Sequence, residues 1–289
     1  MKKLIFVVIV LVVGLLSSCA DEKLGESFFD DSERARNEFD LWLLHNYTYP
    51  YNIDLKYRME DIESDRSYTL IPADIDKAKQ LAKVIRHLWL EPYDEIIGID
   101  FTRTYIPKII HFIGSYAYNV NNTRVLGTAE GGLKVTLYGV NHLTIAPESL
   151  NDMYFRTMHH EFAHILHQTK LYDPDFAKIS DADYIGGNWN SRLTPDANRL
   201  GFVSPYAGSS PNEDFVELYS RFITMTETQW TAMLATAASN SSPGADIIAQ
   251  KMEILTGYML NSWNIDIYEM RDILQRRVGE VFVMDLSKL

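Results

Sequence analysis

Residues 158–167 read Met-His-His-Glu-Phe-Ala-His-Ile-Leu-His, and they carry the most chemistry of any segment in the 289-residue chain. His160 and His164 are four positions apart. On an α-helix they lie on one face, one turn apart, so both imidazoles can reach one metal ion. Glu161 follows the first histidine and can take a proton from a water molecule at that ion. The competing interpretation is a surface helix with scattered histidines, because the segment holds two more of them.

A catalytic zinc site needs a third protein ligand and keeps one position open. His167 is a poor candidate because it lies seven residues after His160, about 10 Å further along the helix axis. Zinc–ligand bonds of roughly 2 Å do not span that distance. The better candidate lies in residues 211–217, Pro-Asn-Glu-Asp-Phe-Val-Glu. We expect Glu213 to be the third ligand, with Asp214 as the alternative.

A second carboxylate follows on the same predicted helix. Glu217 lies four residues after Glu213 and faces the same side. We therefore expect it to hold a ligand histidine in the correct tautomer from behind, and Asp214 is a second candidate for that role. The competing interpretation is a capping box, with Ser210 as N-cap, Pro211 in the first turn and the Glu213 side chain turned back to the backbone.

The N-terminus has the pattern of a lipoprotein signal peptide. Two lysines precede Leu4–Leu16, which are 13 residues without a polar side chain. A spanning helix needs about 20 such residues, so this stretch is too short to cross a membrane. It ends in Leu16-Ser17-Ser18-Cys19, which resembles a bacterial lipobox. We expect residues 1–18 to be removed and Cys19 to carry the lipid; an uncleaved anchor helix is the alternative.

Charge and cysteine content narrow the possible partners. Cys19 is the only cysteine, which excludes a disulfide within one molecule. The net charge of −12 repels phosphate backbones, so nucleic acid is not an expected partner.

Residues 19–32 are expected to be a lipid-anchored tether. We expect an outer-membrane lipoprotein on the periplasmic or cell-surface face; the early acidic pair Asp21-Glu22 resembles surface-export signals of Bacteroidetes lipoproteins.

Hydrophobic periodicity places the other elements. The expected strands are 52–58, 108–113 and 133–140, with a glycine-rich turn at 127–132; the expected helices start at 32, 74, 147 or 149, 211, 227, 244 and 265. Residues 171–210 are rich in Asp, Gly, Asn, Ser and Pro and are expected to be irregular. The chain is therefore predicted to be α+β, with one domain at 33–289. Residues 33–170 form its α+β part with a small mixed sheet and the histidine helix, and residues 171–289 form a helical C-terminal part.

The ligand segment resembles known zinc sites. Asn212-Glu213-Asp-Phe-Val-Glu217 resembles the second motif of gluzincins, Asn-Glu-x-x-x-Asp, with Glu217 in place of the usual aspartate. The segment is also similar to the site of anthrax lethal factor, where a tyrosine precedes the ligand glutamate by seven residues. Tyr206 precedes Glu213 by the same number. The resemblance implies that Tyr206 donates a hydrogen bond to the developing oxyanion or the leaving nitrogen. A loop tyrosine packed on the core is the alternative.

The lipobox, the Tyr-Gly-Val-Asn141 segment and the run ending at Glu217 together resemble one family over nearly the whole mature chain. It is the family of Bacteroidetes zinc-binding metallopeptidases, also called substrate import-associated zinc metallohydrolase lipoproteins. The resemblance implies a zincin-like fold, a Zn²⁺ cofactor and a peptide or protein substrate. It also implies a setting beside an outer-membrane import complex.

The expected reaction is hydrolysis of a peptide bond, with Glu161 as general base. The strand at 133–140 precedes the histidine helix, where zincins place an edge strand that pairs with the substrate; an ordinary sheet strand fits the pattern equally well. One alternative is a binding protein on the same scaffold that captures its ligand without cutting it, but such a protein does not need Glu161. A zinc hydrolase of a non-peptide bond is another. A structural zinc site lacks a fourth ligand such as cysteine.

Overall fold

The computed structural model describes residues 35–118, 124–130, 132–146, 150 and 154–289. The predicted signal peptide, Cys19 and the whole predicted tether lie outside the described residues, as does part of the expected start of the histidine helix. The chain divides into two compact units, residues 1–37 and 38–289, and the second holds every element discussed below. Among the described residues, no helix is both long enough and apolar enough to span a bilayer.

A four-stranded mixed sheet lies in the N-terminal half of the second unit, with strand order β1-β2-β6-β5. The strands β1 (Asp54–Lys56), β2 (Ile109–Phe112) and β6 (Lys134–Leu137) run parallel, and β5 (Gly127–Glu130) pairs antiparallel with β6 at the edge. A separate hairpin pairs β3 (Ala117–Tyr118) with β4 (Arg124–Val125). The three predicted strands are confirmed as β1, β2 and β6, each shorter than expected.

The glycine-rich turn expected at 127–132 is wrong for its first four residues, because they form the edge strand β5. The predicted strand at 133–140 is therefore not the edge strand, since β6 lies between β2 and β5. The glycines of this segment predicted a turn, but Gly127 is explained by its close packing against the histidine helix. A Cβ atom on Gly127 would lie 2.8 Å from Cγ2 of Thr157, so only glycine lets this strand pass so close to the histidine helix.

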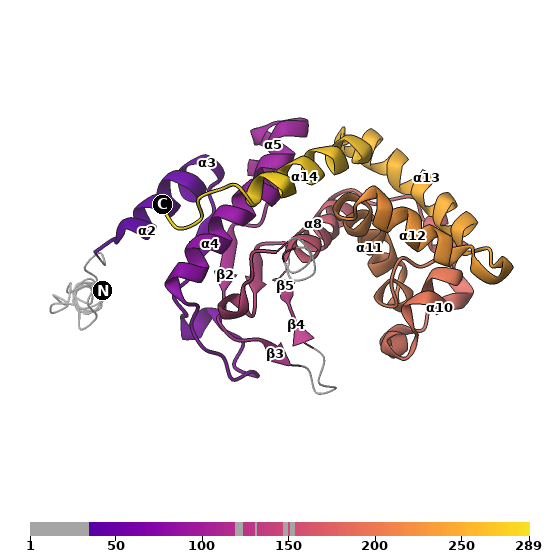
Figure 1. Ribbon diagram of the computed structural model, residues 1–289, viewed down its shortest axis with the longest axis horizontal. Coiled ribbons are helices and arrows are strands. Elements are labelled where there is room, and N and C mark those ends of the chain that lie inside the picture. Colours follow the sequence, from indigo (N-terminus) through magenta and orange to yellow (C-terminus); the bar gives the residue numbers. More distant parts are fainter. Residues whose placement is uncertain (1–34, 119–123, 131, 147–149, 151–153) are drawn as a thin grey trace, which may run out of the picture. The chain divides into compact units, whose positions relative to one another are not determined.

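Helices make up most of the rest of the fold (Figure 1). The α-helices are α2 (Glu38–Leu43), α3 (Tyr49–Tyr51), α4 (Ile75–Ile85), α5 (Glu91–Ile97), α6 (Ile99–Tyr105), α8 (Arg156–Thr169), α9 (Asp175–Ile179), α10 (Thr194–Arg199), α11 (Pro211–Thr224), α12 (Glu227–Ala237), α13 (Gly244–Trp263) and α14 (Ile267–Val281). The π-helical turns are η1 (Leu44–Thr48) and η3 (Arg86–Leu90), and the 3₁₀ turns are η2 (Asp61–Glu63), η4 (Val140–His142), η6 (Asp181–Asp183), η7 (Gly186–Ser191), η8 (Tyr206–Ser209) and η9 (Ser239–Ser241).

The predicted helices from 74, 211, 227, 244 and 265 are confirmed, and Asp74 caps α4 as expected, with its side chain accepting from two backbone N–H groups. The sequence did not predict α5 and α6. They are short, seven residues each, and Gly98 with a φ of 98° separates them. The predicted α+β class, with a small mixed sheet, a histidine-bearing helix and a helical C-terminal part, is confirmed.

The core fixes the position of the histidine helix α8. Its buried face carries Met158, Phe162 and Leu166, all fully buried. The ring of Phe162 meets Tyr93 at 4.8 Å and Trp89 at 6.1 Å, both in edge-to-face geometry. Burying a side chain of this size stabilises the fold by about 1.5–3 kcal/mol. On the other side, α8 packs along α11, so the two helices hold each other in register (Figure 1).

Candidate metal centre

Three side chains from α8 and α11 meet in one place. His160 and His164 come from α8, and Glu213 comes from the first turn of α11. One ligand atom of each lies within 4.8 Å of the other two. Oε2 of Glu213 is 3.1 Å from Nε2 of His160 and 3.4 Å from Nε2 of His164. The structure therefore brings together the three residues that the sequence assigns to the metal.

The donor set and its spacing suit zinc. Bonds of about 2.1 Å in tetrahedral geometry put neighbouring ligand atoms about 3.4 Å apart, close to the separations of Glu213 Oε2 from the two histidine nitrogens. That carboxylate oxygen is buried and accepts no well-formed hydrogen bond from the described residues. An orphaned buried oxygen facing two imidazole nitrogens is the arrangement that a shared cation satisfies. Two histidines and one carboxylate also leave a fourth position open, as in catalytic sites.

Ser210 determines where the ligand glutamate sits. Its side chain caps α11 by accepting from the backbone N–H of Glu213 at 3.3 Å. The capping role therefore uses the backbone of Glu213, and the carboxylate is left to face the histidines. The structure thus combines the serine half of a capping box with a metal-ligand position at Glu213.

Glu217 lies behind the first histidine. Its Oε1 is 3.1 Å from Nδ1 of His160, which leaves Nε2 of that ring toward the ligand site. The other oxygen accepts from Ser204 Oγ at 2.5 Å and from Arg221 Nε at 2.7 Å. Burial alone would raise the pKa of Glu217, but Arg221 and His160 hold it well below its usual range. The carboxylate is therefore an anchored anion that fixes the ring of His160.

His167 has the corresponding place behind the second histidine, which the sequence did not predict. Its Nε2 lies 3.0 Å from Nδ1 of His164. The ring of His167 is itself held edge-on against Tyr172 at 5.5 Å and Phe215 at 6.4 Å. The spacing of three residues between the histidines, which puts them side by side on a helix, is the signal that could have revealed this contact.

Asp214 does not take either role considered for it. Its buried carboxylate is 2.7 Å from Nζ of Lys251 and accepts from Tyr184 Oη at 2.8 Å. Lys251 also donates to the carbonyl oxygen of Gly201 at 2.8 Å. The expectation that Asp214 supports a ligand histidine is therefore corrected. Asp214 pairs with Lys251 and Tyr184 instead, and so ties α11 to α13 and to the segment before η7.

The carboxyl groups of Glu213 and Glu161 have pKa values shifted in opposite directions. Burial would raise the pKa of Glu213, but its contacts with His160 and His164 lower it to about 2. Burial raises the pKa of Glu161, and the charge of Glu213 adds to that rise against the opposing pull of the histidines. A Glu213 with a lowered pKa is ionised at neutral pH, which suits a metal ligand. A Glu161 with a raised pKa suits a group that accepts a proton and later returns it.

A cleft of about 450 Å³ opens onto these residues. Glu161 and Tyr206 line it together with the three ligands, and Gly127 and Thr128 of the edge strand β5 form part of its wall. The ring of Tyr206 stacks on His160 at 5.9 Å and meets Trp189 of η7 at 5.1 Å. Burial and the neighbouring carboxylate of Glu213 raise the pKa of Tyr206, so its hydroxyl stays a hydrogen-bond donor at neutral pH.

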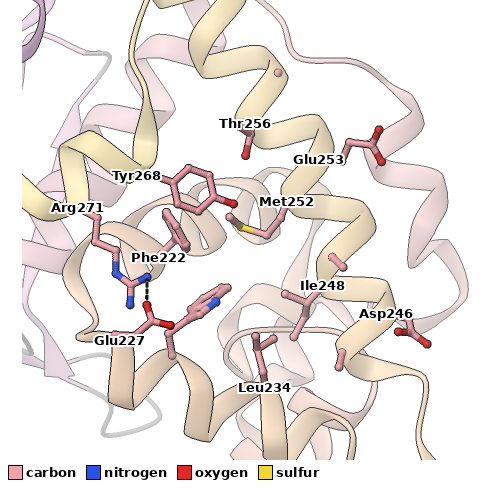
Figure 2. Close-up of a pocket in the computed structure, with 14 residues that line it drawn as sticks. Phe222, Glu227, Leu234, Asp246, Ile248, Met252, Glu253, Thr256, Tyr268 and Arg271 are labelled. Atoms are coloured by element: carbon pink, nitrogen blue, oxygen red, sulfur yellow. Dashed lines mark ion pairs between the residues drawn. The ribbon is translucent and has the colours of Figure 1, made fainter.

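A larger hollow, about 630 Å³, lies elsewhere, among α11, α12, α13 and α14 (Figure 2). Its walls are mainly apolar, with Phe222, Ile248 and Met252 prominent, and the ion pair of Arg271 with Glu227 stands at one end. Its lining contains no histidine and none of the ligand residues. Size therefore does not identify the reactive site in this protein; the cleft at the histidines holds the proton-transfer and metal-binding groups.

Comparison with known proteins gives two matches. The sequence profile of the family described as "Putative zinc-binding metallo-peptidase" matches residues 32–268. Among solved structures, the crystal structure of a putative zinc-binding metallo-peptidase from Bacteroides caccae ATCC 43185 is similar, with 46% sequence identity and a TM-score of 0.77. The match covers 91% of this chain and 99% of that one. No curated protein matches the chain. Zinc is thus the metal of the family as well as the metal that the donor set favours, and the chain belongs to the family of putative zinc-binding metallo-peptidases.

Proposed function

We propose that the protein is a zinc-dependent peptidase that hydrolyses peptide bonds, with the metal held by His160, His164 and Glu213. The observation that carries this proposal is the buried Glu213 oxygen facing both Nε2 atoms, with Glu161 in the same cleft. A metal site with a structural role alone would not need a further carboxyl group, that of Glu161, beside its open side.

When bound, zinc supplies a Lewis acid that polarises the peptide carbonyl and makes a water molecule more acidic. Glu161 accepts the proton of the attacking water and then gives it to the nitrogen of the leaving amine, so the carboxylate is restored at the end of the cycle. Tyr206 donates a hydrogen bond to the carbonyl oxygen as negative charge develops there. Glu217 and His167 keep the two ligand rings in their working tautomers.

The edge strand β5 gives the cleft a way to hold a peptide. An edge strand has one row of backbone N–H and C=O groups without a partner strand, and an extended substrate can pair with them. Residues Gly127 and Thr128 of this strand line the cleft beside the ligands. Substrate pairing with β5 would set the cleaved carbonyl between Glu161 and Tyr206.

The proposal extends to where the protein works. Lys2, Lys3, the apolar stretch after them and the Leu-Ser-Ser-Cys19 motif support a lipid anchor at Cys19. An outer-membrane lipoprotein that cuts peptides beside an import complex follows from that anchor and from the family resemblance. Radiolabelled palmitate incorporated by the wild type and not by Cys19→Ala would support the anchor, and equal labelling would exclude it.

The test of the function is Glu161→Gln, which keeps the shape of the side chain and removes its basicity. Turnover of a fluorogenic peptide pool is compared between zinc-loaded wild type and variant, with zinc content measured in both. We expect turnover to fall by about 10²–10⁴-fold at unchanged zinc content. Undiminished turnover would refute the role of Glu161. Zinc binding without turnover of any peptide by the wild type would favour a non-catalytic binding protein or a hydrolase of another bond.

A further inference from the structure

The larger hollow, between the C-terminal helices, has the size of a small-molecule site (Figure 2). Its volume is about 630 Å³, and such sites typically enclose about 300–1,000 Å³. The described residues that line it belong to α11, α12, α13 and α14. Ala245, Ala249 and Gly257 line it from α13, and their small side chains leave room between the helices.

The floor of the hollow is apolar and packed. Phe222, Trp230, Ile248 and Met252 line it and are otherwise buried in the fold. The ring of Phe222 meets Trp230 at 5.1 Å and Tyr268 at 5.0 Å, both edge-to-face. Because helices form the walls, most backbone groups there are already paired within a helix and offer nothing to the amides of a peptide. A hydrocarbon chain or ring needs no such partners.

Arg271 of α14 closes one end of the hollow with a buried positive charge. Its side chain is only 9% exposed, and the guanidinium lies over the ring of Phe222, with Cζ 5.0 Å from the ring centroid. Nε donates to the carbonyl oxygen of Met225 at 3.1 Å. Nη2 is buried and has no hydrogen-bond partner among the described residues. A buried guanidinium with unused donors favours an anion that accepts from it.

The carboxylate that Arg271 now holds is easily displaced. Oε2 of Glu227 lies 2.9 Å from Nη1, but the Glu227 side chain is 79% exposed. An ion pair with an exposed partner contributes little to stability, so Glu227 can turn outward at small cost. A ligand carboxylate in its place would accept from Nη1 and Nη2 together, in the two-pronged geometry that arginine favours.

The other charges of the hollow leave that end free for an anion. Asp246 and Glu253 of α13 also line the hollow, and both are exposed. Figure 2 shows their carboxylates pointing away from Arg271. The hollow therefore has a cationic end, an apolar floor and acidic groups only at the side that faces water.

We propose that this hollow binds a monocarboxylic acid with an apolar tail, of the fatty-acid type. The ligand carboxylate displaces Glu227 and pairs with Arg271, and the tail lies along Phe222, Trp230 and Met252. The site requires neither the metal nor peptide hydrolysis, so its test stands apart from the test of the proposed function.

The binding test compares octanoate, octanol and octylamine, which share one tail and differ in charge. Calorimetric titration of the zinc-loaded protein gives the affinities, and NMR of labelled isoleucine and methionine methyl groups shows whether Ile248 and Met252 respond. Octanoate should bind about tenfold more tightly than either other probe, because a hydrogen bond between charged groups contributes at least that factor. Equal or tighter binding of octanol or octylamine, or no shift at the two methyl groups with octanoate, would overturn the site.

Two variants should change the affinity for octanoate in opposite directions. Arg271→Gln should weaken it about tenfold, and Glu227→Gln should strengthen it about threefold because the competing carboxylate is gone. The control Glu253→Gln removes the same charge from the lining, away from Arg271, and should change the affinity less than about twofold. Glu227 is exposed, so this arm stands even if Arg271→Gln does not fold. Unchanged or weaker octanoate binding by Glu227→Gln, or an equal gain in Glu253→Gln, would overturn the proposal.

A peptide C-terminus carries the same charge beside an apolar group, and N-acetylphenylalanine represents it. Its amide finds no partner on the helical walls, so it should bind about tenfold more weakly than octanoate. Equal or tighter binding of N-acetylphenylalanine would overturn the fatty-acid assignment in favour of a peptide ligand.

Discussion

Replacing Lys251 by methionine tests how the helix that carries the glutamate ligand is held. The side chains of Lys251 and Asp214 are 0% and 1% exposed, and their charged atoms are 2.7 Å apart. Without the lysine, the Asp214 carboxylate keeps only the hydroxyl of Tyr184 as a described partner. Removing one member of a buried ion pair costs about 3–5 kcal/mol.

Protonation sets an upper limit on that loss. A buried Asp214 without its lysine has a folded-state pKa far above its unfolded value of about 3.9, so the folded state binds a proton that the unfolded state lacks. The free energy needed to protonate the Asp214 carboxylate, starting from its unfolded-state pKa, is about 4 kcal/mol at pH 7 and about 1.5 kcal/mol at pH 5. Lys251→Met should therefore be most destabilising at neutral pH and less so in mild acid.

Urea unfolding of wild type and Lys251→Met at pH 7 and pH 5 measures the effect. We expect the variant to lose about 3–4 kcal/mol at pH 7 and less than half of that at pH 5. The control Lys178→Met removes an exposed lysine that pairs with Asp175 and should cost under about 1 kcal/mol at both pH values. A loss of under about 1 kcal/mol for Lys251→Met at pH 7, or an equal loss at both pH values, would refute the reasoning.

Three further predictions concern the histidines. Glu217→Gln removes the anion behind His160 and should weaken zinc affinity by about 10–100-fold in a competition titration with a chelator; unchanged affinity would contradict the role of Glu217. His167→Phe keeps an aromatic ring in place but removes the nitrogen that accepts a hydrogen bond from His164. The same titration should show about tenfold weaker zinc binding. Zinc affinity equal to that of the wild type would show that His167 only packs against its neighbours. Burial lowers the pKa of His159 to about 3. Below about pH 6.5 the unfolded state therefore binds a proton at His159 that the folded state does not bind, and the free energy of unfolding decreases as the pH is lowered. Between pH 6.5 and pH 5, the wild type should lose about 2 kcal/mol more than His159→Gln in urea unfolding with chelator, and parallel curves would exclude this contribution.

Local patterns in the sequence predicted the parts of the site that lie on regular helices. Ser210 and Pro211 mark the start of α11, and the spacing of four residues puts Glu213 and Glu217 on one face. The same logic places His160 and His164 together. The contact of His167 with His164 is equally local, because a spacing of three residues also brings two side chains together on a helix.

The parts that the sequence did not predict depend on contacts between distant segments. Ser204 reaches Glu217 from the loop between α10 and η8, and Lys251 meets Asp214 from α13. No periodicity relates such residues, because their proximity depends on the tertiary fold. The turn predicted over the residues of β5 is wrong for a similar reason. Gly127 meets a steric demand from Thr157, which lies on a different element.

Zinc content of the purified protein tests the central claim most directly, by elemental analysis of wild type and Glu213→Ala side by side. The geometry of His160, His164 and Glu213 predicts one zinc per chain in the wild type and loss of most of it in the variant. Full zinc in both proteins would show that Glu213 is not the third ligand, and no zinc in either would contradict the metal site itself.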